Sequence, residues 1–488
     1  MINRYIMTLP SLLPHTILTA LVALAAFGTH SLWSHEGYGN LHHWETASAD
    51  PDRIVLTFAG DPATSRAVTW RTSAEVKNAV AEITVSLGEP GMFDQTIQVT
   101  AETESFDMNR YSSNKQGVVH YHSAEFSDLQ PDTLYAYRVG DGRRRWSEWI
   151  QFRTAAAEPA PFRFLYFGDA QNNVLSTWSR VIRMANQTAP DARFAIHAGD
   201  LINMAHSDQE WAGWFKAGSF LHAQWATVPV LGNHEFMPLK EEEKPTRHVS
   251  ILWRPQFTLP LVSELPEKLH ETVYSISYQG AQIIVLNSSQ SIEAQTEYLK
   301  ARLQEPGYQW RIVSYHHSIY SPRGRSNTET DLMRKYWVPL FHQYRVDLVL
   351  QGHDHAYTRG IKSAAIRDEV DTSPSPVVYI TSVSGQKQYE VQREALERYQ
   401  QEYQVTTDRI AENTQFFQVI NVDSQRLTYR AYTATGELYD TIHIDKNPSD
   451  GTKTITSDPP VTPERNFGNT TGKSHDVIKA MREALKKK

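Results

Sequence analysis

The 488-residue chain contains no cysteine. This absence excludes disulfide bridges, thiolate metal sites and a cysteine nucleophile, so no disulfide-linked partner is expected. A metal ion could bind only through nitrogen and oxygen ligands, which favours hard or borderline ions. Long basic runs are lacking too, and the formal net charge is −7. A surface that matches the phosphates of a nucleic acid is therefore not indicated, and no nucleic-acid partner is expected.

Long hydrophobic stretches are scarce. The clearest one, residues 17–27, is rich in Leu and Ala but shorter than a transmembrane helix normally is. With Arg4 as a weakly positive region, it predicts a signal peptide within residues 1–33, cleaved between Ala25 and Ser34. An uncleaved membrane anchor is the alternative. Both place the rest of the chain outside the cytoplasm, so we expect an exported protein, periplasmic or secreted.

The overall composition is that of a soluble globular protein, with 40% hydrophobic and 21% charged residues. The length allows two or three domains. Twelve tryptophans and 23 tyrosines without cysteine are typical of an exported bacterial protein whose core needs no disulfides. His35, His42 and His43 lie in a predicted N-terminal arm, where histidines are usually solvated and only occasionally bind metal.

Residues 52–154 are predicted to be all-β. Short apolar stretches alternate with turn signals such as Asp61-Pro62 and Asp141-Gly142. This spacing is typical of a small antiparallel sandwich. The stretch 129–137 resembles the last Greek-key corner of fibronectin type III modules. No acid–base pair stands out in this region, which predicts a structural role.

After the linker at residues 155–161, strands alternate with helical segments, which indicates a layered α/β domain over residues 160–446. A charged segment, 386–404, is predicted to be a helical insertion. We expect two loops to line the pocket: residues 384–414, which include this segment, and the irregular stretch 239–270. From residue 447 the chain is rich in Ser, Thr and Pro, which predicts a flexible tail to residue 488. The apolar residues of a possible short terminal helix are Val477, Ile478, Met481 and Leu485.

Five predicted strands of the α/β region end in polar residues that can bind metal. They are Asp169 with Gln171, Asp200, Asn233 with His234, His316, and His353 with His355. Most have a glycine just before the polar residue, which lets the backbone turn and aim the side chain into a shared crevice. Carboxylate, carboxamide and imidazole groups can bind a pair of ions without thiolates. One shared carboxylate can hold two ions about 3.5–4 Å apart, as in-line phosphoryl displacement requires.

Each strand end also has an ordinary structural explanation. A lone Asp before a helix is more often a cap than a ligand, and a lone Gly-Asn-His is more often a turn. A lone buried histidine usually satisfies a hydrogen bond in the core. Five such ends in succession, however, favour one common site over five separate coincidences.

The order of these motifs resembles that of the calcineurin-like metallophosphoesterases: Asp-x-(His/Gly), Gly-Asp, Gly-Asn-His-(Asp/Glu), His and Gly-His-x-His. Within that superfamily the chain looks most like the purple acid phosphatases. The features that carry this likeness are the fibronectin-like N-terminal domain and the stretches 232–235, 313–316 and 352–357. The resemblance covers about residues 52–445. It implies an all-β sandwich followed by a βαβαβ, two-sheet α/β metallophosphoesterase domain.

The resemblance also implies roles for single residues. Asp200 would bridge two metal ions, which would be Fe, Zn or Mn. His234 would bind no metal and would stabilise or protonate the leaving oxygen, so Asp200 and His234 are the expected catalytic residues. The first ion would be bound by Asp169 and His355, and the second by Asn233, His316 and His353.

The chain departs from the purple enzymes at two metal positions. Their Gly-Asp-x-x-Tyr motif supplies a tyrosinate to iron, whereas the corresponding residue here is Asn203. Their first motif has glycine where this chain has Gln171, at a position where other superfamily members have a histidine ligand. We therefore expect Gln171 to bind the first ion through its amide oxygen. A neutral amide is a weaker donor than tyrosinate, so no Fe(III) charge-transfer colour is expected.

The substrate side also differs from the family. The purple enzymes have further histidines after the His motif, whereas the corresponding stretch here, 321–326, has no histidine and contains Arg323 and Arg325. These two arginines could bind a substrate phosphate in a fork geometry. A solvated loop is the alternative. His317 and His206 could contact the metal ligands without binding the ions themselves.

The sequence as a whole predicts a dinuclear metal-dependent phosphoric ester hydrolase, in which a metal-activated water attacks phosphorus in line. We expect an exported acid phosphomonoesterase that acts on a phosphorylated small molecule. One alternative is a phosphodiesterase or nucleotide pyrophosphatase that uses the same site. Another is an exported binding protein with a degenerate site. The oligomeric state stays open.

Overall fold

The structure is a computed structural model that describes residues 44–110, 117–239, 246–362 and 375–465. Everything described below belongs to the unit that begins at Ala47. The predicted signal peptide, the histidines of the N-terminal arm and the terminal helix near Val477 lie outside the described residues. Within the described ranges, no helix is long and apolar enough to cross a membrane.

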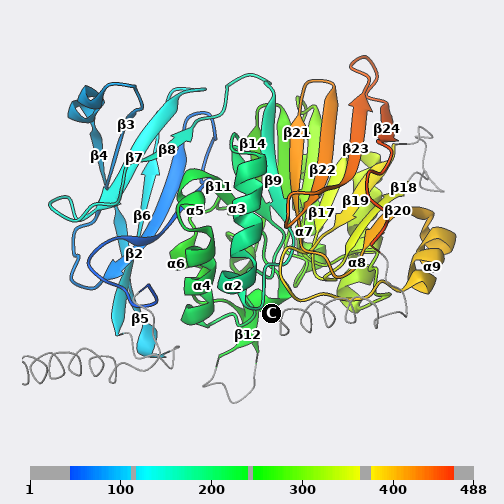
Figure 1. The fold of residues 1–488 in the computed structure, drawn as a ribbon, viewed down its shortest axis with the longest axis horizontal. Helices are drawn as coiled ribbons and strands as arrows, with labels where there is room; N and C mark the ends of the chain where they lie inside the picture. The colour runs from blue at the N-terminus through cyan, green and yellow to red at the C-terminus, as the bar shows by residue number, and fades with distance from the viewer. Residues whose placement is uncertain (1–43, 111–116, 240–245, 363–374, 466–488) are drawn as a thin grey trace, which may run out of the picture. The chain divides into compact units, whose positions relative to one another are not determined.

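The N-terminal region is a two-sheet β-sandwich, which confirms the prediction (Figure 1). One sheet has the order β4-β3-β7-β8, and the other contains β1, β2, β6 and β5 side by side. Two of its strands were not expected, since β4 and β5 are mostly exposed and polar and so lack an apolar alternation. The strands are β1 (Asp52–Thr57), β2 (Arg66–Ser73), β3 (Val80–Val85), β4 (Ile97–Thr100), β5 (Glu102–Asp107), β6 (Val118–Phe126), β7 (Leu134–Gly140) and β8 (Ile150–Arg153).

The first sheet of the α/β region is continuous with the sandwich. Thr57 of β1 pairs in parallel with Thr227 of β11, which gives one eleven-stranded sheet of order β24-β23-β22-β21-β9-β10-β11-β1-β2-β6-β5. The linker at 155–161 therefore separates two regions of the chain that share a sheet. The additional strands are β9 (Phe162–Phe167), β10 (Phe194–His197), β11 (Ala226–Pro229), β21 (Phe416–Val422), β22 (Arg426–Thr433), β23 (Leu438–Lys446) and β24 (Lys453–Ser457).

A second sheet of the α/β region has the order β14-β15-β16-β17-β19-β18-β20. Neighbouring residues on its strands alternate between two cores. Ile283 and Ile312 pack in the core shared with the first sheet, whereas Ile284 and Val313 pack in a separate core with helix residues. The strands are β14 (Tyr274–Tyr278), β15 (Ala281–Val285), β16 (Trp310–Ser314), β17 (Leu348–Gln351), β18 (Tyr357–Lys362), β19 (Val377–Thr381) and β20 (Val405–Ala411).

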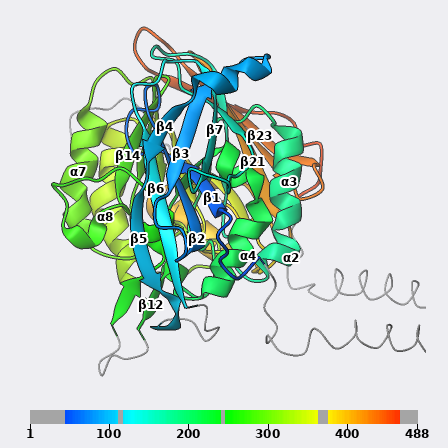
Figure 2. The same cartoon turned by 90° about the vertical axis from the view of Figure 1, so that its left-hand side faces the viewer.

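Helices cover the outer faces of the two sheets, and Figure 2 shows α3 and α4 on one side of the molecule and α7 and α8 on the other. The predicted two-sheet α/β architecture is thus confirmed. The helices are α2 (Val174–Thr177), α3 (Ser179–Thr188), α4 (Asp208–Gly218), α5 (Phe220–Gln224), α6 (Trp253–Gln256), α7 (Ile292–Gln304), α8 (Thr328–Gln343) and α9 (Arg393–Tyr403). A short hairpin, β12 (Phe236–Pro238) and β13 (Arg247–Val249), follows β11.

Two segments differ from the prediction. The helix expected over 386–404 begins only at Arg393, because the N–H groups of Tyr389 and Val391 donate to His355 O and Glu412 Oε1 instead of to a helix ladder. Regular structure also continues past residue 446, into the stretch predicted to be flexible. There β24 pairs with β23, and the buried Lys453 ammonium lies 3.3 Å from Asp347 Oδ1.

Two buried histidines in the core are expected to make the stability of the fold sensitive to acid. His222 stacks on Trp214 with ring centroids 3.8 Å apart, and burial lowers its pKa to about 3 although a bond to the Trp214 backbone opposes this. The ring centroid of His197 lies 5.9 Å from that of His222, and neither ring nitrogen of His197 has a hydrogen-bond partner. Burial lowers the pKa of His197, and the neighbouring His222 lowers it further. Both pKa values are below the unfolded value of about 6.5, so the neutral histidines stabilise the fold above that pH.

We expect the free energy of unfolding to fall as the pH drops from 6.5 towards 3, by about 1.4 kcal/mol per pH unit for each of the two histidines. Urea unfolding at several pH values measures this slope. The variant His222→Phe keeps an aromatic ring against Trp214 and should show a shallower slope than the wild type. An unchanged slope in that variant would assign the acid sensitivity to other groups.

Candidate functional site

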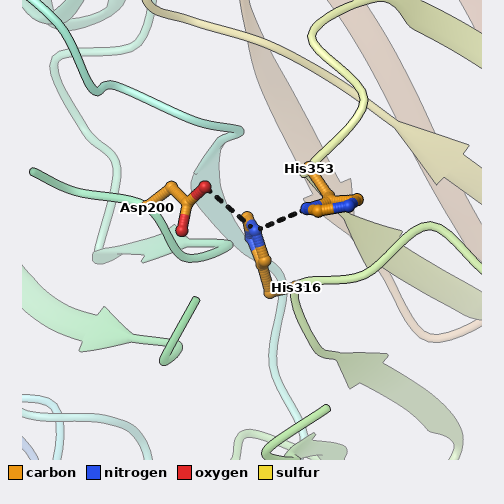
Figure 3. Close-up of side chains that lie close together, drawn as sticks. All are labelled: Asp200, His316 and His353. Atoms are coloured by element: carbon orange, nitrogen blue, oxygen red, sulfur yellow. Dashed lines mark hydrogen bonds and ion pairs between the residues drawn. The ribbon is translucent and has the colours of Figure 1, made fainter. Parts of the chain in front are cut away.

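The five predicted strand ends meet at one edge of the α/β region, and three of their side chains are drawn in Figure 3. The parallel strands β9, β10 and β11 of the first sheet and β16 and β17 of the second end next to one another. Their carboxyl ends are followed by the residues that the sequence singled out: Asp169 and Gln171 after β9, Asp200 after β10, Asn233 and His234 after β11, His316 after β16, and His353 and His355 after β17.

Glycines are required where these turns approach one another. A Cβ on Gly352 would lie 2.2 Å from Asp169 Oδ1, and a Cβ on Gly199 would lie 2.6 Å from His316 Nδ1. Gly199 also has a φ of +87°, which side-chain-bearing residues rarely adopt. Glycine therefore allows the backbone to pass close beside the functional side chains.

One group of three potential ligands consists of Asp169, Asp200 and His355, whose ligand atoms all lie within 4.8 Å of one another. All three side chains are buried. Nε2 of His355 lies 3.2 Å from Asp169 Oδ2, while its Nδ1 donates to Lys387 O at 2.8 Å. That outer bond fixes the proton on Nδ1 and leaves the Nε2 lone pair directed into the group, as in metal-binding histidines.

A second group consists of Asp200, His316 and His353, again with all ligand atoms within 4.8 Å (Figure 3). Nδ1 of His316 donates to Ala198 O at 2.8 Å, and its Nε2 lies 3.2 Å from Asp200 Oδ2. Oδ1 of Asn233 lies 2.8 Å from His353 Nδ1 and 3.1 Å from His316 Nε2. Asp200 is thus common to both groups.

The charges of the site suit cations. Burial raises the pKa of Asp169 to about 7. The negative charge of Asp200 also raises it, whereas the charge of His316 lowers it. Burial alone would also raise the pKa of Asp200, but the charge and hydrogen bond of His316 lower it well below its usual value. Asp169 Oδ2 and Gln171 Oε1 are buried without a hydrogen-bond donor. Because buried oxygens without partners are costly, a cation would stabilise this donor set.

Gln171 borders the first group. Its Nε2 lies 2.9 Å from Asp200 Oδ2 and 3.0 Å from His355 Nε2. A half-turn of the planar amide would exchange Nε2 with the unpartnered Oε1. Gln171 can therefore present an amide oxygen to the same position without moving its backbone.

His234 belongs to neither group. Its backbone N–H donates to Asp200 Oδ1 at 2.8 Å, and its Nδ1 donates to Asn203 O at 2.8 Å. Its Nε2 stands 4.0 Å from Asp200 Oδ2, and the side chain is 28% exposed. The imidazole is thus oriented by Asn203 and remains accessible next to the shared carboxylate.

Glu235 is the last residue of the stretch 232–235 and was given no role from the sequence, yet it organises the loop that carries Asp200. Its Oε2 accepts from the N–H groups of Asp200 and Gly232 at 2.9 and 2.8 Å, and its Oε1 accepts from Leu201 at 2.8 Å. Burial raises the pKa of Glu235 to about 8, and the negative charge of Asp200 also raises it. Hydrogen bonds from backbone N–H groups act in the opposite direction. The hydrogen bonds of this buried side chain hold the loop in which Asp200 has an unusual φ of 50°.

Of the two predicted substrate-side arginines, Arg325 lies next to the second ligand group and Arg323 lies near the first. Nη1 of Arg325 is 3.1 Å from His353 Nε2, and its Nε is 3.6 Å from Asp354 Oδ1. The Arg323 guanidinium lies over the Tyr389 ring, 4.1 Å from the centroid. Tyr389 packs edge-on against His355. This tyrosine was missed because its segment was predicted to be a helical insertion.

The two further histidines differ in position. His317 is buried, bonds Ser288 Oγ through Nδ1 at 2.9 Å, and has its ring centroid 4.4 Å from that of His353. It therefore packs directly against a residue of the second group. His206 instead donates from Nε2 to Met237 O at 3.1 Å and receives a bond from the Ile251 N–H, so its ring is engaged with the β12–β13 region.

Comparison with known families matches both regions of the chain. Residues 51–154 match the purple acid phosphatase N-terminal domain, and residues 162–357 match the calcineurin-like phosphoesterases. In solved structures, the fold is similar to that of the purple acid phosphatase PPD1 from yellow lupin seeds, with a TM-score of 0.65. That alignment has 17% identity and covers 82% of this chain and 75% of the lupin chain.

Curated relatives are similar over more than half of the chain. An uncharacterized protein of Mycobacterium tuberculosis is 28% identical over 69% of this chain and 67% of its own length. The phosphoenolpyruvate phosphatase of Allium cepa is 27% identical over 61% of this chain and 63% of its own length. The Fe(3+)-Zn(2+) purple acid phosphatase 12 of Arabidopsis thaliana is 26% identical over 56% of this chain and 60% of its own length.

Proposed function

The chain belongs to the calcineurin-like phosphoesterases and carries a purple acid phosphatase N-terminal domain, and from this we propose that it is a dinuclear metal-dependent phosphomonoesterase. The observation that carries the proposal is that Asp200 is shared by two groups of potential ligands. A shared carboxylate is what a two-metal phosphoryl-transfer site requires. The substrate is a phosphorylated small molecule.

We propose the following ligands. The first ion binds Asp169, Asp200, His355 and the amide oxygen of Gln171, and the second binds Asp200, Asn233, His316 and His353. Two ions bound there would supply a water nucleophile near neutral pH and stabilise charge on the phosphoryl oxygens. All the donors are nitrogen and oxygen atoms, which suits Fe, Zn or Mn. The name of the Arabidopsis relative, which cites iron and zinc, supports the first two.

His234 is proposed as the group at the leaving oxygen. The carbonyl of Asn203 holds the Nδ1 proton of His234, so Nε2 is the atom that faces the opening beside Asp200. From there a protonated His234 donates to the ester oxygen as its bond to phosphorus breaks, which avoids the release of a free alkoxide. His234 requires no movement of the backbone for this, since its N–H is fixed on Asp200 Oδ1.

Arg325 is proposed to bind the phosphate that reacts. Its Nη1 now donates to Nε2 of His353. When Nδ1 of His353 is a ligand, Nε2 carries the ring proton and cannot accept this bond. The guanidinium then needs another acceptor, and a phosphate oxygen of the substrate provides one. This added cation favours the dianion of a monoester over the monoanion of a diester.

A comparison of p-nitrophenyl phosphate with bis(p-nitrophenyl) phosphate on metal-loaded protein tests the proposal. We expect metal-dependent hydrolysis with a higher kcat/KM for the monoester. A higher value for the diester would instead favour a phosphodiesterase or nucleotide pyrophosphatase. Absence of hydrolysis of both, in protein that binds metal, would favour a binding protein. Export remains part of the proposal and rests on residues 17–27.

The metal-loaded protein is expected to lack the visible charge-transfer band of an iron tyrosinate. The residue at the family's tyrosine position is Asn203, whose backbone carbonyl is occupied by His234. The proposed neighbour of the first ion is an amide, Gln171, which gives no such band. The visible absorption spectrum of iron-loaded protein measures this, and a strong band in the purple region would contradict the proposed ligand set.

A further inference from the structure

Three cationic side chains gather around the ring of Tyr389, next to the first ligand group. Cζ of Arg323 lies 4.1 Å from the ring centroid, Cζ of Arg325 lies 5.0 Å from it, and Nζ of Lys387 lies 5.5 Å from it. The same ring packs edge-on against His355, with centroids 4.7 Å apart. We call these four residues, Arg323, Arg325, Lys387 and Tyr389, the cationic rim.

Backbone hydrogen bonds fix the cationic rim to the site. The N–H groups of Arg323 and Arg325 both donate to the buried Ser321 Oγ at 3.2 Å. The Tyr389 N–H donates to His355 O at 3.0 Å. Lys387 O in turn accepts from Nδ1 of His355 at 2.8 Å. These bonds hold the backbone of the cationic rim beside Ser321 and His355.

Two of the three cations of the cationic rim, Arg323 and Lys387, have no ion-pair partner in the described residues, whereas Arg325 is paired with Asp354. The Nε atom of Arg325 lies 3.6 Å from Asp354 Oδ1. The chain as a whole is acidic, with a formal net charge of −7. Two neighbouring cations without an ion-pair partner, Arg323 and Lys387, form an attractive site for a phosphate.

We assign Arg325 to the phosphate that reacts, because its guanidinium lies 3.1 Å from Nε2 of a proposed metal ligand, His353. Arg323 and Lys387 are left for another anionic group. We propose that they bind a second phosphate, so that the preferred substrate has a leaving group that carries a further phosphate. This inference rests on the proposed function, since the rim borders the site at which the ester bond would break.

Adenosine diphosphate and adenosine monophosphate form a matched pair of substrates for this proposal. Loss of the terminal phosphate from the diphosphate leaves a phosphorylated group, whereas the monophosphate leaves uncharged adenosine. The double variant Arg323→Gln/Lys387→Gln is expected to lower the ratio of kcat/KM for the diphosphate to that for the monophosphate by about tenfold, because two charge interactions of about 0.7 kcal/mol each are lost. Comparison with the wild type cancels the intrinsic reactivity of the two substrates.

Two control variants separate the rim from general effects. Tyr389→Phe keeps the aromatic face and should keep the ratio within about twofold, whereas Tyr389→Leu removes the support of the cations and should lower it several-fold. Arg144→Gln removes an exposed arginine of the β7–β8 connection, far along the chain from the rim. It should leave kcat/KM for both substrates unchanged. A wild-type ratio in the double variant would overturn the proposal.

Binding of tripolyphosphate to metal-free protein, measured by calorimetry, tests the cationic rim without catalysis. The rim needs no metal, so wild-type protein should bind and the double variant should bind at least about tenfold more weakly. Equal binding by both proteins would overturn the proposal. Failure to hydrolyse any phosphate ester, with rim-dependent binding intact, would instead count against the proposed function.

Discussion

Replacing Asp200 by asparagine is expected to lower kcat/KM for p-nitrophenyl phosphate by at least about a thousandfold, which corresponds to roughly 4 kcal/mol of transition-state stabilisation. Asp200 is the one residue shared by both ligand groups, and its buried carboxylate carries the charge that faces His316. An amide of the same size keeps the acceptor for the His234 N–H but loses the negative charge that both proposed ions need. Metal content should fall together with activity.

The matched control for this variant is Asp94→Asn, which changes an exposed aspartate in a short helical turn of the sandwich. It should bind as much metal as the wild type and hydrolyse the ester at the same rate. Thermal unfolding of the Asp200 variant checks that the fold persists. Wild-type activity in folded Asp200→Asn protein would show that the reaction takes place at another site.

Replacing Glu235 by glutamine is expected to lower the free energy of unfolding by about 3 kcal/mol and to weaken metal binding as well. The two carboxylate oxygens accept from backbone N–H groups of Gly232, Asp200 and Leu201. Glutamine would place an NH2 group against at least one of these donors, so a buried N–H would lose its acceptor. The loop that holds Asp200 at positive φ would then relax.

Urea unfolding and metal titration measure the two effects of Glu235→Gln. Glu125→Gln serves as the control, because Glu125 is an exposed residue of β6 and its replacement should change neither quantity. If Glu235→Gln protein keeps wild-type stability and metal affinity, the bonds from Glu235 to the backbone do not position Asp200.

The gathering of the strand-end residues could be predicted because it follows from simple rules. An apolar stretch, a glycine and a polar side chain mark where a buried strand ends, and parallel strands bring such ends to one edge. Asp169, Asp200 and His316 were found in this way, and the structure brings them together. The metal ligation of these residues stays a prediction.

Other features could not be predicted because they depend on contacts distant in the sequence. Glu235 acts through backbone N–H groups more than thirty residues away, for which no local pattern exists. Tyr389 is positioned by the carbonyl of His355, and that bond replaces a helix which the local sequence favours. The parallel contact between Thr57 and Thr227 likewise joins strands from regions that a Pro-rich linker separates.

Anomalous diffraction from crystals of the metal-loaded protein tests the central claim most directly. We predict two anomalous peaks about 3.5–4 Å apart, one on each side of the Asp200 carboxylate. The first should contact Asp169 and His355, and the second His316 and His353. A single peak, or peaks that do not touch Asp200, would contradict the two-metal site and the hydrolase function derived from it.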